Sequence, residues 1–334
     1  MTEWPSSNAY TIAIQNPQAC FRDSDLRSAR VARMPLTGMP KVWTGNYAQV
    51  YELEGETGPW AVKCFTRSAP DLRDRYRQVA TALAHSRLPY FVDFEFLDDE
   101  ILINGSRYPV VKMRWAEGQP LDQFVASSLR RPRALLIMAA RLLSMVRDLE
   151  QHRFAHGDLQ HGNIVVTRTG VTLVDYDGMF VPAFAGSHAP EGGLPGYQHP
   201  ARSATDYGVG LDRFAALVIC TASSALAADP GLWDEFSTGD NLLFTSGDFG
   251  DPQRSRLFQR LRTIDEPEVR ALSASLEAAC AKRPLDVPLP DLPVTFLGTS
   301  RRDFFRVESR EDSALRAAAR FLNRTYRIRV KLRG

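Results

Sequence analysis

The sequence is poor in the residues that form zinc knuckles, redox centres and membrane spans. Its 334 residues include four cysteines, which lie 44 or more positions apart, so a local zinc knuckle and a CxxC dithiol motif are excluded. The longest uncharged run, Phe214–Ala228, is 15 residues long and includes Thr221, Ser223 and Ser224. A membrane-spanning helix needs about 20 apolar residues. We therefore expect this run to form a buried core helix.

A strong charge of one sign is also absent. The chain has 41 Lys and Arg against 39 Asp and Glu, a net charge of +2, which excludes a strong overall field toward nucleic acid or anionic membranes. The average hides a basic end, because residues 301–334 carry eleven Lys and Arg against four acids. The opening residues lack the basic segment and apolar stretch of a secretory signal, and we expect a cytoplasmic protein.

Strand patterns dominate the first third of the chain. Residues 41–65 alternate short apolar runs with glycine-containing turns, and residues 90–115 do so around a turn at Asn104-Gly105. From about residue 121 the pattern becomes helical, with a long apolar face over Leu135–Leu149. Between the two strand regions, an amphipathic helix is predicted from apolar residues at helical spacing, which are Leu72, Tyr76, Val79 and Leu83.

These patterns predict an α+β protein with two lobes. A small β-rich lobe is expected over residues 41–117 and a larger α-helical lobe over residues 118–284, with the join near Glu117-Gly118. Residues 1–40 are expected to form an ordered extension that packs on the small lobe. Their apolar side chains favour this packing over a free tail, and they include Ile12, Ile14, Cys20 and Phe21.

The end of the chain departs from the two-lobe pattern. Residues 285–334 are predicted to form a Pro-rich linker and a basic amphipathic tail, in which residues 313–326 place apolar and arginine side chains on different faces of a helix. Such a helix could bind a partner, RNA or an anionic membrane surface, or could pack its apolar side on the acidic body of the protein. The sequence does not identify the partner.

Four polar residues occur in an order typical of phosphoryl transfer. Lys63 follows an apolar strand, where its ammonium group can reach phosphate oxygens as a point charge. Asp158 and Asn163 lie five residues apart before a short strand, so a carboxylate can meet a hydroxyl while the amide holds a metal ion. Asp175 ends a further apolar strand and offers the hard oxygen ligand that Mg²⁺ prefers.

In this order and spacing, the residues resemble the eukaryotic-type protein kinase superfamily, in a divergent bacterial-like form with an HGDLxxxN catalytic loop. The similarity spans roughly residues 41–284. Thr44–Val50 resembles the glycine loop that covers the phosphates, although one glycine remains there. Three further segments resemble the strand with the phosphate-binding lysine, the catalytic triplet and the DFG motif, and they are Ala61-Val62-Lys63, His156-Gly157-Asp158 and Asp175-Tyr176-Asp177.

The resemblance implies a bilobal protein-kinase-like fold that binds ATP and Mg²⁺ between its lobes. It implies that Lys63 orients the phosphates, that Asp158 is the catalytic base, and that Asn163 and Asp175 hold Mg²⁺. Asp177 is either a further metal ligand or a turn residue. An adenine-binding hinge is implied at Met113–Ala116, with Met113 as gatekeeper. The residues implied in nucleotide binding are Gly45, Ala48, Val50, Lys63, Met113, Arg114 and Ala116.

Two downstream segments bear on the acceptor. Gly196–Ala201 resembles the end of a protein-kinase activation segment, and Asp212 resembles the buried aspartate that begins the central helix of the large lobe. Small-molecule kinases do not usually share these segments. The resemblance therefore implies transfer to Ser or Thr hydroxyls of a protein substrate.

Several positions depart from the family pattern and keep other functions open. The helix after Lys63 has no glutamate to pair with that lysine, and Gln78 is predicted to lie nearest the expected place. Gly157 replaces the arginine of the catalytic triplet, and Ala201 or Arg202 replaces the glutamate of the APE motif, while Ala189–Glu191 is interpreted as a chance match. These departures favour, as alternatives, a pseudokinase that binds nucleotide as a scaffold and a small-molecule kinase.

Overall fold

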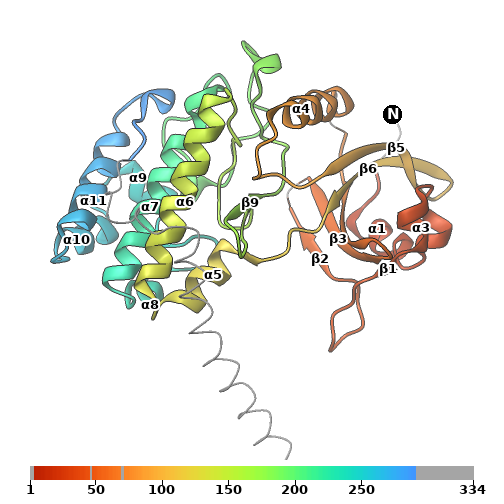
Figure 1. The fold of residues 1–334 in the computed structure, drawn as a ribbon, viewed down its shortest axis with the longest axis horizontal. Coiled ribbons are helices and arrows are strands. Elements are labelled where there is room, and N and C mark those ends of the chain that lie inside the picture. Colours follow the sequence, from red (N-terminus) through yellow and green to blue (C-terminus); the bar gives the residue numbers. More distant parts are fainter. Residues whose placement is uncertain (1–3, 46, 69–70, 291–334) are drawn as a thin grey trace, which may run out of the picture.

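The computed structural model describes residues 4–45, 47–68 and 71–290 and contains both helices and an antiparallel sheet (Figure 1). The α+β class is confirmed, as are the strands predicted over residues 41–65 and 90–115. In the described residues the main sheet has six strands in the order β1-β3-β4-β6-β5, with β2 beside β3. These strands are β1 (Arg30–Val31), β2 (Val42–Thr44), β3 (Ala48–Gly55), β4 (Gly58–Phe65), β5 (Phe94–Ile103) and β6 (Ser106–Arg114).

The register of β4 and β6 places two lysines on opposite faces of the sheet. Residues paired across an antiparallel ladder share a face, whereas neighbours along a strand point to opposite faces. Lys63 pairs with Val111, and Val62 pairs with Lys112. Lys63 therefore lies on one face and Lys112 on the other, although both are buried.

The helix α4 (Leu72–Ser86) packs against the face of the sheet that carries Lys63. The amphipathic helix predicted from Leu72 is thus confirmed, and it continues to Ser86. Tyr76 and Val79 are its buried residues, and they join a core cluster that includes Phe65 and Val111 from the sheet. This packing brings the buried side of α4 toward the end of β4.

Residues near the start of the chain cover the opposite face of the sheet. Tyr10 and Leu26 are fully buried there in a second core cluster with Tyr51 and Val62. The carboxylate of Glu100 accepts hydrogen bonds from two consecutive backbone N–H groups, those of Arg22 and Asp23, each at 2.7 Å. The helices of this segment are α1 (Ser7–Ala13), α2 (Pro17–Cys20) and α3 (Ser24–Ser28), drawn in red beside the sheet in Figure 1.

The remaining helices gather at the end of the molecule away from the main sheet (Figure 1). The long apolar stripe predicted over Leu135–Leu149 lies on α6, where its hydrophobic residues are buried against α7 and neighbouring helices. These helices are α5 (Leu121–Ser128), α6 (Pro132–Gln151), α7 (Arg213–Ala228), α8 (Leu232–Phe236), α9 (Ser246–Gly250), α10 (Arg256–Arg262) and α11 (Pro267–Ala279).

The longest uncharged run of the sequence is the centre of this helical part. Over the described residues, Val209–Ala228 is the one helical stretch long and apolar enough to cross a membrane by length and composition. However, 89% of its most apolar window is buried inside the protein. The prediction that Phe214–Ala228 is a core helix is therefore confirmed.

A small sheet lies between the main sheet and the helices. Its strands are β7 (Gln119–Pro120), β8 (Ile164–Val166) and β9 (Val171–Leu173), in the order β7-β8-β9. The loop before β8 carries residues 155–163, and the long segment after β9 runs from Val174 to the start of α7. Three 3₁₀ turns interrupt that segment, at Pro182–Phe184, Pro195–Tyr197 and Val209–Asp212.

The predicted tail falls mostly outside the described residues. Of the segment 285–334, residues 285–290 are described, and the first of them belong to a 3₁₀ turn at Pro284–Asp286. The carbonyl of Pro290 accepts a hydrogen bond of 3.4 Å from the Arg147 guanidinium group on α6. The basic amphipathic helix predicted over residues 313–326 lies outside the described residues.

Candidate functional site

Lys63 reaches from the main sheet to two carboxylates that follow β9. Its Nζ lies 2.5 Å from Asp175 Oδ1 and 2.6 Å from Asp177 Oδ2. The lysine is 8% exposed, whereas 42% of the Asp175 side chain is exposed. Three of the predicted site residues thus meet where the main sheet faces the helical part, and one carboxylate remains accessible from outside.

The two aspartates keep Lys63 charged. Burial alone would lower the pKa of this ammonium group, but the negative charges of Asp175 and Asp177 outweigh burial and raise the pKa well above its usual range. Removing either carboxylate would leave part of a buried charge uncompensated, which is costly. An incoming phosphate could therefore replace the carboxylates as partner of Lys63, and a cation could replace Lys63 as partner of the carboxylates.

Asp158 and Asn163 are in direct contact in the loop before β8. The Asn163 amide Nδ2 donates to Asp158 Oδ2 at 3.0 Å and to the Asp158 backbone carbonyl at 2.9 Å. The other carboxylate oxygen, Oδ1, accepts a hydrogen bond of 2.8 Å from the Leu194 backbone N–H. Both oxygens of Asp158 thus accept hydrogen bonds from the protein itself.

The approach of the 193–194 backbone to Asp158 depends on a glycine. Gly193 has φ +73°, and a Cβ at this position would lie 2.7 Å from Asp158 Oδ1 and 2.5 Å from the side-chain amide of Gln198. Only glycine fits both this backbone conformation and this spacing. The segment between β9 and α7 therefore lies directly on the carboxylate that the resemblance implies to be the base.

A buried aspartate holds the backbone of the loop before β8 in place. Asp212, at the start of α7, accepts hydrogen bonds from the backbone N–H groups of His156, at 2.6 Å, and Gly157, at 2.8 Å. Burial raises the pKa of Asp212, while these two backbone donors and the His156 charge oppose that rise. His156 is itself fully buried, and its Nε2 donates to the Val174 carbonyl at 3.0 Å. His156 therefore links the loop to the segment that carries Asp175.

The prediction for Gln78 is wrong, because its side chain is exposed. The residue of α4 that faces the site is Tyr76, whose hydroxyl donates to Asp177 Oδ1. The neighbouring Arg75 donates from Nε to the Asp177 carbonyl at 2.7 Å and from Nη2 to the Met179 carbonyl at 2.6 Å. Lys63 takes its carboxylates from the turn after β9 instead of from α4. The helical period Leu72–Tyr76–Val79 would have identified Tyr76 in the sequence.

Glu191 is a site residue that sequence reasoning missed. It belongs to the Ala189–Glu191 match interpreted as chance, yet its half-buried carboxylate lies beside Gly178, where an added Cβ would meet its Oε1 at 3.3 Å. Burial, with smaller contributions from the charges of Asp175, Asp177 and Asp158, raises the pKa of Glu191 to about 7. Nothing local in the sequence marks this residue, because its neighbours come from distant loops.

The residues predicted for the glycine loop lie at the ends of β2 and β3. The N–H of Gly45 donates to the Ala48 carbonyl at 2.9 Å and closes a tight turn, in which Asn46 lies outside the described residues. Ala48 is buried, and Val50 pairs in register with Lys63. The loop is thus attached directly to the strand that carries the lysine.

The predicted hinge residues lie where β6 ends and the chain crosses to the small sheet. Met113 is buried, and Ala116 is partly exposed. The Arg114 guanidinium carbon lies 3.7 Å from the ring centroid of Trp60, and the Arg114 backbone N–H already donates to the Asp93 carbonyl at 2.8 Å. The backbone N–H of Arg114 is therefore already hydrogen-bonded within the protein.

The acidic residues do not form a complete metal site by themselves. Within the described part of the chain, no group of three or more His, Cys, Asp or Glu side chains is placed to hold a metal ion. Asn163 and Asp175 nevertheless provide the hard oxygen donors that Mg²⁺ prefers. Mg²⁺ commonly binds through one or two protein carboxylates and completes its coordination with water and phosphate oxygens. The donor set fits Mg²⁺ on those terms.

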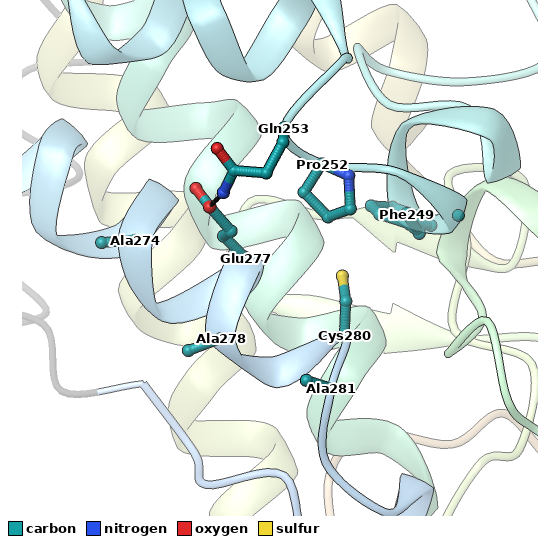
Figure 2. A pocket seen from close by; sticks show the side chains of 9 residues that line it. Phe249, Pro252, Gln253, Ala274, Glu277, Ala278, Cys280 and Ala281 are labelled. Carbon is teal, nitrogen blue, oxygen red and sulfur yellow. Dashed lines mark hydrogen bonds between the residues drawn. The ribbon is translucent and has the colours of Figure 1, made fainter.

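A pocket of about 590 Å³ lies elsewhere, between α9 and α11 (Figure 2). None of the predicted site residues lines it. Figure 2 shows the Gln253 amide hydrogen-bonded to Glu277 at its edge and Cys280 pointing toward it. Burial raises the pKa of the Cys280 thiol to about 11, so this cysteine is not an activated nucleophile. The pocket therefore carries none of the chemistry assembled around Lys63.

No protein-family model matches the chain, and no curated protein matches it. The residues of the site and their contacts are therefore the evidence for its chemistry.

Proposed function

We propose that the protein is a bilobal, protein-kinase-like enzyme that transfers the γ-phosphoryl group of ATP to Ser or Thr hydroxyls of a protein substrate. Residues 41–117 would form the small lobe and residues 118–284 the large lobe. The observation that carries the proposal is the contact of Lys63 with Asp175, whose neighbour Val174 donates its N–H at 3.0 Å to the carbonyl of Asn163, the partner of Asp158. These four residues come from separate places in the sequence and supply the cation, carboxylates and amide that phosphoryl transfer needs.

Each residue would have a separate task. Lys63 would exchange its carboxylate partners for phosphate oxygens and hold the nucleotide by charge. Asn163 and Asp175 would hold Mg²⁺, with Asp177 as a further ligand or as the residue that positions Lys63. ATP supplies the phosphoryl group, and Mg²⁺ neutralises the charge that develops during its transfer.

Asp158 would accept the proton of the attacking hydroxyl. Its Oδ2 is oriented by Asn163, and the backbone of the same loop is fixed by Asp212. A group that is held in place before reaction loses little entropy when the acceptor binds. The turn from Gly45 to Ala48 would cover the phosphates and exclude water, and Met113–Ala116 would border the adenine.

A specific contact favours one alternative, a nucleotide-binding scaffold without turnover. Leu194 donates to Asp158 Oδ1, the oxygen that is not held by Asn163. An acceptor hydroxyl would have to share this oxygen with the Leu194 N–H, because a carboxylate oxygen can accept more than one hydrogen bond. If the segment blocks the hydroxyl, the cleft binds nucleotide but transfers nothing.

The test is incubation of the purified protein with γ-labelled ATP and Mg²⁺, with three sets of acceptors. These are generic Ser- and Thr-rich proteins, aminoglycosides, and choline-like alcohols. We expect label on protein acceptors, its loss when Mg²⁺ is chelated, and a fall of about 100-fold or more in the Asp158→Asn variant.

Other outcomes of this test contradict the proposal. Label on a small molecule alone would replace the protein acceptor with a small-molecule one. No label together with thermal stabilisation by Mg²⁺ and ATP would identify the nucleotide-binding scaffold. Turnover that is unchanged in Asp158→Asn would remove this residue from the reaction.

A further inference from the structure

Position 157, where the resemblance places an arginine, has no room for a side chain. Gly157 has φ +84°, a backbone conformation that L-residues rarely adopt. A Cβ built on it would lie 2.2 Å from the carbonyl oxygen of Gly178, well inside van der Waals contact. The loop therefore could not carry its own arginine beside Asp158 without rebuilding the backbone at both glycines.

A guanidinium group reaches this place from elsewhere in the chain. Arg202 lies 45 residues after Gly157, and its Nη1 donates to the Gly157 carbonyl at 2.9 Å. The same nitrogen donates to the Gln198 side-chain carbonyl, and Nη2 donates to the Glu191 carbonyl at 3.4 Å. A single side chain thus joins the loop before β8 to two points of the segment between β9 and α7.

Arg202 carries its charge in a partly buried place that is lined by acidic groups. Burial lowers the pKa of this guanidinium group, while the nearby charges of Asp212, Asp158 and Glu191 act in the opposite direction. Arginine stays protonated in proteins under ordinary conditions. Arg202 is therefore a permanent cation next to the backbone that carries Asp158.

We propose that Arg202 is a positioning residue that holds the 191–198 segment against the Asp158 loop, so that this arrangement needs no phosphorylated residue in the segment. The inference rests on the proposed function for its effect on turnover. In many switches, a phosphate orders a segment by pairing with an arginine beside the active site. Here the arginine lies in the same stretch of chain between β9 and α7, and its donors bind carbonyl oxygens that are always present.

The position of the Arg202 contacts explains how they act on Asp158. Gly157 immediately precedes Asp158, and residues 191 and 198 flank the Gly193-Leu194 backbone that donates to its carboxylate. Loss of the guanidinium group would release the loop and the segment together. Asp158 would then lose its orientation without any change in the residues that meet the nucleotide.

The test compares Arg202→Gln and Arg202→Lys with the wild type, and uses Arg260→Gln as the matched control. Arg260 is a half-exposed arginine paired with Asp229 on the helical part and touches none of the site residues. Hydrogen exchange is measured over residues 156–163 and 187–199, because local release of these segments speeds amide exchange without requiring catalysis. Turnover is measured in parallel, before and after treatment of each protein with a phosphatase.

We expect Arg202→Gln to speed exchange in both segments and to lower kcat by about tenfold or more while KM for ATP changes by less than about twofold. Arg202→Lys keeps the charge but loses the planar fork, so it should recover part of both effects. The Arg260→Gln control should leave exchange in both segments unchanged. Phosphatase treatment should leave the wild type unchanged in exchange and turnover.

Two results would overturn the inference. One is unchanged exchange of the two segments in Arg202→Gln, which would mean that other contacts hold them. The other is faster exchange or lost turnover in the wild type after phosphatase treatment, which would mean that phosphorylation orders the segment. If the wild type transfers no phosphate while Arg202→Gln still speeds exchange, the proposed function fails and the positioning by Arg202 stands.

Discussion

Lys63 and Lys112 lie on opposite faces of the same sheet and have almost the same surroundings. Their side chains are 10% and 6% exposed, and each Nζ contacts two aspartates within 2.8 Å. In both cases burial would lower the pKa of the ammonium group, and the carboxylates outweigh burial and raise it. A buried lysine between two carboxylates is therefore not by itself a functional site.

The difference lies in where the partners come from and what surrounds them. Lys112 binds Asp23, which caps α3 through a 2.9 Å hydrogen bond to Leu26, and Asp25 in the first turn of that helix. Its ammonium group also lies 4.4 Å from the ring centroid of Trp60. This lysine attaches the first helices of the chain to the sheet, and its charge is paired with carboxylates of those helices.

Lys63 instead binds carboxylates that lie 112 and 114 positions later in the chain, at the junction with the helical part. Around them stand the Asp158–Asn163 pair and the half-buried Glu191, which has an unusually high pKa. An acid with a raised pKa among carboxylates that surround one cation is typical of a reactive site. The groups around each ion pair, and not the pair itself, therefore distinguish a candidate site from a structural contact.

The largest expected effect comes from replacing each lysine by methionine. Lys63→Met should lower phosphoryl transfer by about 100-fold or more, because the nucleotide phosphates lose their cation. Lys112→Met should leave turnover within about threefold and lower the free energy of unfolding by about 1–3 kcal/mol, because two aspartates lose their partner. Label transfer measures turnover of both variants, and urea denaturation measures their stability. Equal losses of turnover in the two variants would contradict the different roles given to Lys63 and Lys112.

A smaller effect is expected from two buried tyrosines, one on each face. Tyr76→Phe removes the hydroxyl that donates to Asp177, and Tyr10→Phe removes one that donates to the Phe65 carbonyl at 2.7 Å. Each variant should lose about 1 kcal/mol of unfolding free energy. Only Tyr76→Phe should also lower turnover, by about tenfold or less, because Asp177 orients Lys63. A similar fall in turnover for Tyr10→Phe would contradict this assignment.

The smallest expected effect is a pH dependence at Glu191. Its pKa is raised to about 7 in the folded protein, so between pH 4.5 and 7 the folded chain binds more protons than the unfolded chain. The unfolding free energy should therefore fall as pH rises through this window. Glu191→Gln should remove about 1 kcal/mol of this fall, since partial exposure weakens the effect. Denaturation in a metal-free buffer across this range measures it, and parallel profiles for the two proteins would contradict it.

Local patterns in the sequence predict most of the elements. Alternation and turn residues identified the strands around Lys63, and helical spacing identified α4 and the stripe on α6. Of the predicted site residues, Lys63 contacts Asp175 and Asn163 contacts Asp158, while the roles of the four residues stay predictions. The strands and helices are confirmed because each depends on neighbours in sequence.

Other features depend on contacts between distant segments and could not be predicted from the sequence. Val110-Val111-Lys112 is similar in sequence to Ala61-Val62-Lys63, and the two lysines differ through the strand register and the elements packed on each face. The resemblance places Gln78 nearest Lys63, although the helical period places Tyr76 toward the site. Glu191 meets Asp175 and Asp177 only after the chain folds. Strand register and loop packing determine which of these side chains reach the site, and local composition predicts neither.

The most direct test of the central claim is calorimetric titration of ATP in the presence of Mg²⁺ into the wild type, Lys63→Met and Lys112→Met. We expect the wild type and Lys112→Met to bind with similar affinity. We expect Lys63→Met to bind at least about tenfold more weakly, because a charge-assisted contact to phosphate is lost. Equal affinity in all three proteins, or no binding by the wild type, would contradict the assignment of the Lys63 cluster as a nucleotide site.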